Sequence, residues 1–565
     1  MRVFIVSLLL VQGVFGSLAK FDKNLAFRSP FGNEPQFGHD TVALSRRNIQ
    51  PSRRDVVAAS KFKDEEYPGF FGSDFSNGDP LDTSIILWTR AVPLPSKSGQ
   101  LPDQSAPVCV SFKISTNSDV SGKPIDSGEA FTSYDIDFTV KVEATGLKAD
   151  TKYFYQFADC TNPSKVSPIG RTRTLSSSNT PADKVNGGKP LTFAVFSCSQ
   201  FQAGWFNAYG FATHNTTADV FVHLGDYIYE SVGDGAPIGR QTLGRELATI
   251  ADYRQRLNQY RTDLDLQAAH QHAPWITVWK FAGVRAYHEW MPIRQVDAQD
   301  QLRIWRNFQI GKLLDLTMLD TRQYDRDVTD VNYNRVVASL ADVPGRSLMG
   351  PKQEKWFLDT LSESKSRGAI WRIVGQQIVF SQLEEFGFID YDAWEGYRAN
   401  RNRILDHLYE NHISNTAILS GDSHANWASD LAPIQTFRRC QRYYHVQSDT
   451  GRGAIGVEFA GTGVTSTTAP FSTETFDQAT NTSAVFVRDN IDLQWSEGFF
   501  RGFFTLEVSP KTLHATYYSM RNVTFRNLDG FAVASFIVNA GENRLSRPVA
   551  GGKVLSGALK SQVVH

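Results

Sequence analysis

Residues of the kinds that bind metal ions follow several short apolar segments of the chain. These are Cys198 at the end of LTFAVFSC, Asp226 and Tyr229 after DVFVHLG, Asp320 at the end of LLDLTMLD, and Asp422 and His424 after NTAILSG. Apolar segments of this kind are typical of strands buried on both faces. In an open α/β sheet, sites form beyond the carboxyl ends of the strands. We therefore expect these side chains to converge on one cleft.

The combination of residue types indicates a mixed metal site. Carboxylates suit hard cations, histidine suits transition metals, and a thiolate or phenolate holds a trivalent or borderline ion. A metal bound in this way lowers the pKa of water and offsets the negative charge of a phosphate ester. The expected chemistry is hydrolysis of a phosphate ester by a metal-bound hydroxide.

Each of these residues also has an ordinary structural explanation. A single aspartate at a strand end usually belongs to a turn or caps a helix. Cys198, in an apolar run, is more often a buried core residue or half of a disulfide. Tyr229 would ordinarily be a packing residue, and His424 a hydrogen-bonded polar residue. The metal-site hypothesis therefore depends on their joint placement.

The pattern of the chain changes near residue 190. Runs such as SIILWTR and VCVSFKIS predict a small antiparallel β-sandwich over 67–175, followed by a linker over 176–190. From 191 to 545, short apolar runs alternate with longer amphipathic segments, which predicts an α/β domain. The expected strands are LTFAVFSC, DVFVHLGD, PWITVW, LLDLTMLD, WRIVGQQ and NTAILSGD. Further strands after residue 450 suggest a second sheet, with a lead-in over 17–66 and a tail over 546–565.

Composition and the amino terminus bear on location and partners. The 58 Lys and Arg residues nearly balance the 59 Asp and Glu residues, so there is no basic excess that would indicate nucleic-acid binding. The opening MRVFIVSLLLVQGVFGS predicts a signal peptide over 1–16, too short to span a bilayer. No later segment predicts a membrane anchor. We therefore expect a secreted, extracellular protein.

Cysteines and glycosylation sequons fit an exported protein. The four cysteines allow two disulfides, but a metal-binding Cys198 would leave one cysteine unpaired. Cys109 and Cys160 lie in the same β-rich region and are the preferred pair. Acceptor sequons begin at Asn215, Asn481 and Asn522.

Several blocks of the sequence resemble the PhoD-type alkaline phosphatase family in order. They are NGDPLDTSIILWTR, FAVFSCSQ, VFVHLGDYIYE, DYRQRLNQYRTDLDLQAAH, AYHEWMPIR, LTMLDTRQYDRD and AILSGDSHANWASDL. The resemblance implies a metallophosphatase-like αββα layered core and a small phosphate mono- or diester as substrate. It also implies Fe³⁺ bound by Cys198, Asp226, Tyr229 and His424, and Ca²⁺ facing Asp226 and Asp422.

The sequence departs from the family pattern after PWITVW. In the family, an acidic WDDHE-like block and a long loop follow, and they supply another calcium ligand. Here the chain runs from Trp279 through Lys280 to Gly283 and directly into VRAYHEWMPIR. Calcium usually takes six to eight oxygen ligands, and a lysine cannot supply one, so we expect an incomplete calcium site.

Three explanations of this departure remain open: an omitted coding segment, a weak enzyme, or a noncatalytic descendant. The last corresponds to the alternative function, a glycosylated extracellular binding protein on a phosphatase scaffold.

Overall fold

The computed structural model describes residues 22–30, 75–92, 107–277, 283–327, 334–385, 388–432, 446–467 and 471–563. The expected signal peptide (1–16), most of the lead-in (17–66) and Lys280 lie outside the described residues. Within the ranges given, no helix combines the length and the apolar character needed to cross a membrane.

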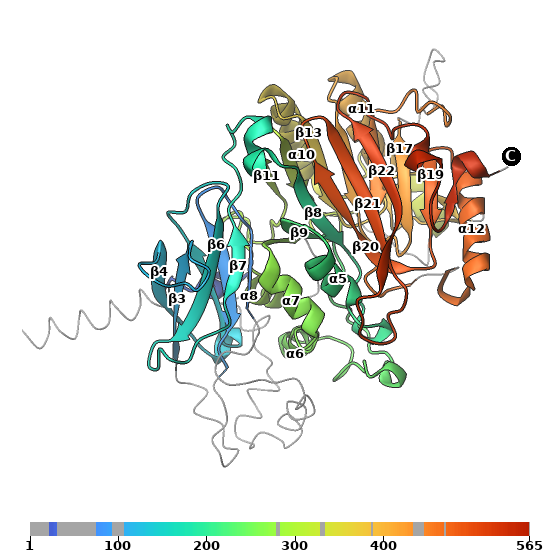
Figure 1. The fold of residues 1–565 in the computed structure, drawn as a ribbon. Helices are drawn as coiled ribbons and strands as arrows, with labels where there is room; N and C mark the ends of the chain where they lie inside the picture. The colour runs from blue at the N-terminus through green and yellow to red at the C-terminus, as the bar shows by residue number, and fades with distance from the viewer. Residues whose placement is uncertain are drawn as a thin grey trace, which may run out of the picture.

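Two large sheets form the centre of the molecule (Figure 1). The first has nine strands in the order β22 (Gly530–Asn539), β21 (Thr512–Met520), β20 (Arg501–Val508), β8 (Leu191–Phe196), β9 (Val220–His223), β10 (Trp275–Thr277), β1 (Phe75–Gly78), β2 (Ile85–Arg90) and β5 (Thr139–Ala144). Strands β8, β9, β10 and β1 run parallel to one another. Every residue of β8 is buried, as its apolar sequence predicts.

The second sheet has eight strands. Their order is β11 (Arg306–Ile310), β12 (Leu314–Met318), β13 (Trp371–Gln376), β16 (Thr416–Ser420), β18 (Gly456–Ala460), β17 (Asn426–Leu431), β19 (Leu493–Glu497) and β23 (Ala558–Leu559). Strands β12, β13, β16 and β18 are parallel. Phe193 and Phe503 of the first sheet share one hydrophobic cluster with Leu316 and Trp371 of the second, so the sheets pack face to face.

Helices cover the outer faces of both sheets. The described helices are α5 (Asn207–Asn215), α6 (Ile250–Tyr260), α7 (Leu264–His272), α8 (Val284–Trp290), α9 (Asn334–Leu340), α10 (Gly350–Ser366), α11 (Arg398–Glu410) and α12 (Phe476–Asp489). Helices α5 and α7 pack beside the first sheet, whereas α10 and α11 share a hydrophobic cluster with β13 and β16 of the second. The expected αββα layered core is thus confirmed.

The segment ADYRQRLNQYRTDLDLQAAHQH forms two helices, α6 and α7, which meet near Asp263. The Asp263 side chain accepts hydrogen bonds from the backbone N–H groups of Asp265 and Leu266, at 3.0 Å each, and so begins α7. Helix α6 begins at a capping box formed by Thr249 and Asp252.

The amino-terminal sandwich is present, but it is not a separate unit. Its four-stranded sheet consists of β4 (Asp126–Thr132), β3 (Val108–Ser115), β6 (Lys152–Asp159) and β7 (Gly170–Arg173). This sheet shares a hydrophobic cluster with β1, β2 and β5, which are the edge of the nine-stranded sheet. Strand β1 joins the two regions because Gly78 pairs with Trp275 of β10. A disulfide links Cys109 to Cys160, with the Cα atoms 5.4 Å apart.

The lead-in, the linker and the tail each contact the sheets. The lead-in contributes Asn24, whose side-chain amide donates to the Thr139 carbonyl of β5 at 2.9 Å. The expected linker contains Val185, which is buried in the main hydrophobic cluster. The expected tail supplies β23, which pairs with β19. Hydrogen bonds, a buried apolar residue and strand pairing thus dock these segments on the sheets.

Substituting Gly78 tests the connection between β1 and β10. A Cβ at Gly78 would lie 2.6 Å from the Trp275 carbonyl oxygen and 2.8 Å from that of Pro292. We expect Gly78→Ala to lower the free energy of unfolding by about 1–3 kcal/mol, measured by urea unfolding with tryptophan fluorescence. Gly345→Ala is the matched control, since a Cβ at Gly345 would have no atom within 4 Å. Equal stability of the two variants would contradict this account of the junction.

Candidate metal centre

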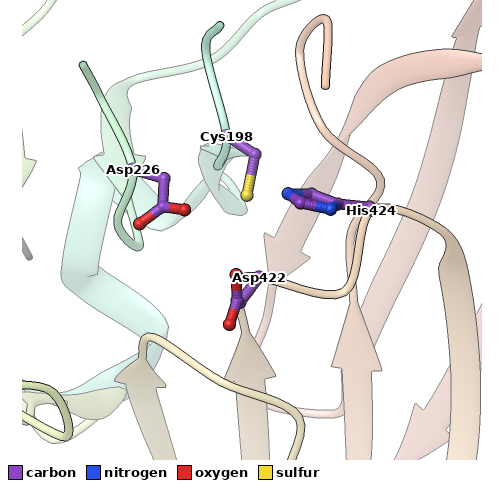
Figure 2. A group of neighbouring side chains, drawn as sticks. All are labelled: Cys198, Asp226, Asp422 and His424. Atoms are coloured by element: carbon purple, nitrogen blue, oxygen red, sulfur yellow. The ribbon is translucent and has the colours of Figure 1, made fainter. Parts of the chain in front are cut away.

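Four of the sequence-predicted side chains converge. The ligand atoms of Cys198, Asp226, Asp422 and His424 all lie within 4.8 Å of one another, and Figure 2 shows them around a common space. Cys198 follows β8 and Asp226 follows β9, whereas Asp422 and His424 follow β16 of the other sheet. The centre therefore lies where the carboxyl ends of strands from both sheets meet.

All four residues have a left-handed backbone. Their φ angles are 59° for Cys198, 53° for Asp226, 60° for Asp422 and 50° for His424. This region costs a non-glycine residue roughly 1–2 kcal/mol, although Asp and His tolerate it better than most. Such residues persist where the surrounding structure holds them, and they are concentrated at functional sites.

Backbone hydrogen bonds tie the loops after β8 and β9 together. The Cys198 N–H donates to the Gly225 carbonyl at 3.1 Å, and the Ser199 N–H donates to the Asp226 carbonyl at 2.8 Å. The Cys198 carbonyl also accepts from the Ser466 hydroxyl at 3.0 Å. These bonds fix the strained corner at Cys198 from both sides.

Tyr229 lies next to the cluster. Its Oη is 3.2 Å from Nε2 of His424 and 2.8 Å from Oγ of Ser466. Its backbone N–H donates to Oη of Tyr260 at 3.2 Å. Tyr229 is thus close enough to join the four residues around one ion.

Burial controls the protonation of the thiol and the phenol. Burial raises the pKa of the Cys198 thiol to about 12, and the nearby Asp226 carboxylate contributes to the rise. Burial also raises the pKa of Tyr229 well above its usual value, with Cys198 and Asp226 adding to the effect. Both groups are therefore protonated at neutral pH, and a bound cation must displace their protons.

Asp320 is not part of the cluster. Its Oδ1 accepts from the backbone N–H groups of Arg322 and Gln323 at 3.1 and 3.0 Å, so it closes its own turn. Burial raises the pKa of Asp320 to about 6. The ordinary structural explanation of a strand-end aspartate applies here.

Two arginines that the sequence interpretation did not single out contact the centre. Arg322 forms an ion pair with Asp422, and another with Asp392 at 2.5 Å. Arg501 donates to the backbone carbonyls of His424 and Ser466 at 2.6 and 2.7 Å. Arg322 lies in LTMLDTRQYDRD, one of the blocks that resemble the family, whereas nothing near Arg501 in the sequence pointed to the centre.

A buried histidine, His223, holds the loop after β9 in place. Nδ1 of His223 accepts from the Gly225 N–H at 3.3 Å, and Nε2 lies 3.0 Å from Oη of Tyr209. Burial lowers the pKa of His223 to about 3, so the ring is neutral and its Nδ1 remains an acceptor. The segment DVFVHLGD thus contributes a positioning residue as well as Asp226.

Most of the chain is similar to PhoD-like phosphatases. The family model described as PhoD-like phosphatase matches residues 193–280 and 280–517, and the one described as PhoD-like phosphatase, N-terminal domain, matches 58–176. Alkaline phosphatase D of Bacillus subtilis (strain 168) is 30% identical over 550 residues, which cover 90% of this chain and 87% of the relative.

Two solved phosphatase structures also resemble this chain. The structure of PhoD matches with a TM-score of 0.70 and 28% identity, covering 88% of this chain and 96% of that one. Purple acid phosphatase PPD1 from yellow lupin seeds matches with a TM-score of 0.50 and 10% identity, covering 82% and 73% of the two chains. The second match concerns the fold alone.

Metal binding is expected to release protons and to strengthen as pH rises. Because the pKa of Cys198 lies far above neutral, lowering the pH opposes binding, and the apparent affinity should rise about ten-fold per pH unit for each proton released. Titration calorimetry with Co²⁺ between pH 6 and 8, in two buffers of different ionisation enthalpy, measures both quantities. Cys198→Ala should release about one proton fewer. An affinity that does not change with pH would contradict the assignment.

Proposed function

Because this chain belongs to the PhoD-like phosphatase family, a family of metal-dependent phosphohydrolases, we propose that it hydrolyses phosphate mono- or diesters at the centre formed by Cys198, Asp226, Tyr229 and His424. The observation that supports this location best is the convergence of the ligand atoms of Cys198, Asp226, Asp422 and His424 within 4.8 Å, from segments far apart in sequence. Tyr229 Oη lies beside them, 3.2 Å from Nε2 of His424. Membership of the family supports hydrolysis of phosphoesters, and the residues and the ion are our proposal.

The donor set fits a trivalent iron ion. A buried thiol and a buried phenol with raised pKa values need a strongly charged cation to displace their protons, and thiolate, phenolate and imidazole together favour a transition metal. Such a cation, when bound, lowers the pKa of water and offsets the negative charge of a phosphate ester.

Residues around the cluster orient the ligands. Ser466 Oγ is within hydrogen-bond distance of Tyr229 Oη and the Cys198 carbonyl, so it sets the relative position of both. Arg501 holds the carbonyl of His424, and its side chain is buried. Arg322 places a positive charge beside Asp422, which favours the approach of an anionic substrate.

The resemblance also implies calcium facing Asp226 and Asp422. Asp422 is already paired with Arg322, and the family match divides into two segments that meet at Lys280. The proposal therefore assigns iron to the centre and treats the calcium site as incomplete.

Export from the cell is also proposed. The predicted signal peptide (1–16) provides the route, and the disulfide between Cys109 and Cys160 suits an oxidising compartment. The sequons at Asn215, Asn481 and Asn522 place their asparagines at exposed positions, where glycans would meet solvent. Asn481 lies within α12, and the hydroxyl residue of its sequon, Ser483, is buried. Asn215 and Asn522 are therefore the better acceptors.

A noncatalytic binding protein on the same scaffold is the second candidate. The observation that favours it is the interruption of the family match at Lys280, where the acidic block expected from the resemblance is missing. Metal analysis separates the two candidates. A protein that retains no iron after reconstitution, with unchanged stability, would support the binding protein.

Hydrolysis should depend on the predicted ligands. With iron supplied, we expect the purified protein to hydrolyse p-nitrophenyl phosphate or bis(p-nitrophenyl) phosphate, and Tyr229→Phe to lower kcat/KM by about 100-fold or more, because the phenol oxygen is lost from the centre. Tyr134→Phe, on the surface of the sandwich, is the control and should leave kcat/KM unchanged.

Two results would count against the proposal. One is equal activity of Tyr229→Phe and the parent protein. The other is no hydrolysis by this chain, with hydrolysis appearing only after an acidic loop is inserted between Thr277 and Gly283, which would reject activity for the sequence as it stands.

A further inference from the structure

Arg322 occupies a fixed position beside the centre. It lies in the turn after β12, its side chain is only 3% exposed, and its backbone N–H donates to Oδ1 of Asp320. The backbone N–H of Asp320 in turn donates to Oε1 of Gln353 at 2.7 Å. The turn is thus held at several points, and the guanidinium cannot move far without breaking them.

The guanidinium pairs with two carboxylates at once. One ion pair joins Arg322 to Asp422, and the other joins it to Oδ2 of Asp392 at 2.5 Å. A guanidinium remains protonated throughout the physiological pH range. The group therefore carries a permanent positive charge against one wall of the cluster.

A second metal ion would have to compete with this charge. Calcium usually takes six to eight oxygen ligands and needs carboxylates that are free to coordinate it. Among the described residues, groups of three or more potential ligands within mutual reach occur at the centre itself and at the Cys109–Cys160 disulfide with Glu129. Beside Asp422, the carboxylate of Asp392 is paired with the same Arg322 side chain, so a cation bound between these two carboxylates would have to displace the guanidinium.

We propose that the centre binds one metal ion and that Arg322 stands in for a second cation beside Asp422. This inference rests on the proposed function, because it takes the Cys198, Asp226, Tyr229 and His424 set as the site of the single ion. A planar guanidinium forms paired hydrogen bonds with the oxygens of carboxylates and phosphates. Arg322 can therefore both neutralise Asp422 and offer positive charge to a bound phosphate group.

Metal stoichiometry tests the inference without relying on activity. The full-length protein, reconstituted with iron, is titrated with Ca²⁺ by calorimetry, and its metal content is measured by mass spectrometry. At roughly millimolar Ca²⁺, a concentration at which weak extracellular calcium sites fill, we expect the parent protein to contain one iron ion per chain. We do not expect it to bind a stoichiometric Ca²⁺ ion. Arg322→Ser should bind one Ca²⁺ at least about ten-fold more tightly, because Asp422 loses the guanidinium and Asp392 keeps only its pair with Arg326.

Two matched variants separate charge replacement from a general structural effect. Arg322→Lys keeps the charge and should continue to exclude Ca²⁺. Arg326→Ser removes another partner of Asp392, which Arg326 contacts at 2.7 Å, but leaves the pair with Asp422 intact. It should therefore bind Ca²⁺ as weakly as the parent protein.

The outcomes are distinguishable. Iron and calcium bound together in the parent protein would overturn the inference and leave the proposed function intact. Absence of Ca²⁺ binding in a folded Arg322→Ser variant would also overturn it, since the guanidinium would then not be what excludes the ion. If Arg322→Ser does not fold, the Arg322→Lys variant decides the matter. Binding of one Ca²⁺ per chain by Arg322→Lys would overturn the inference, because this variant keeps the positive charge. Failure of the parent protein to bind iron would reject the proposed function and the inference together.

Discussion

The centre depends on four residues whose backbone has the left-handed conformation, which L-amino acids rarely adopt. Cys198, Asp226, Asp422 and His424 all have positive φ, and the strain at each is on the order of 1–2 kcal/mol. A chain whose total stability is typically about 5–15 kcal/mol retains such strain only where other interactions hold it. The hydrogen bonds between the loops after β8 and β9, and the packing of the two sheets beneath them, do so.

The two sheets and the sandwich hold these four residues in place. The parallel strands β8 and β9 deliver Cys198 and Asp226, whereas β16 of the other sheet delivers Asp422 and His424. Face-to-face packing therefore brings one half of the centre against the other. The sandwich lies at the far edge of the nine-stranded sheet and shares its β1, β2 and β5 strands, so it extends the same scaffold.

Most of the central strands could be predicted because their residues are buried on both faces and form continuous apolar runs, as in LTFAVF of β8. The ligand types at their ends were equally visible. The pairing of β20 with β8, which places β20, β21 and β22 in the first sheet, could not be predicted, because register between distant strands leaves no local pattern. Contacts between residues far apart in sequence also give Arg322, Ser466 and Arg501 their places beside the centre. Arg322 lies 100 residues from Asp422, Ser466 lies 268 from Cys198, and Arg501 lies 77 from His424. Each of these residues alone has an ordinary solvent-facing explanation.

Iron-loaded protein should hold its ion at the centre formed by Cys198, Asp226, Tyr229 and His424. A crystal structure of iron-loaded protein, with anomalous diffraction collected above and below the iron absorption edge, locates the ion directly. The account predicts a single iron peak in contact with Sγ of Cys198, Oη of Tyr229 and the side chains of Asp226 and His424. An iron peak elsewhere, or fully loaded protein with no peak among these side chains, would contradict it.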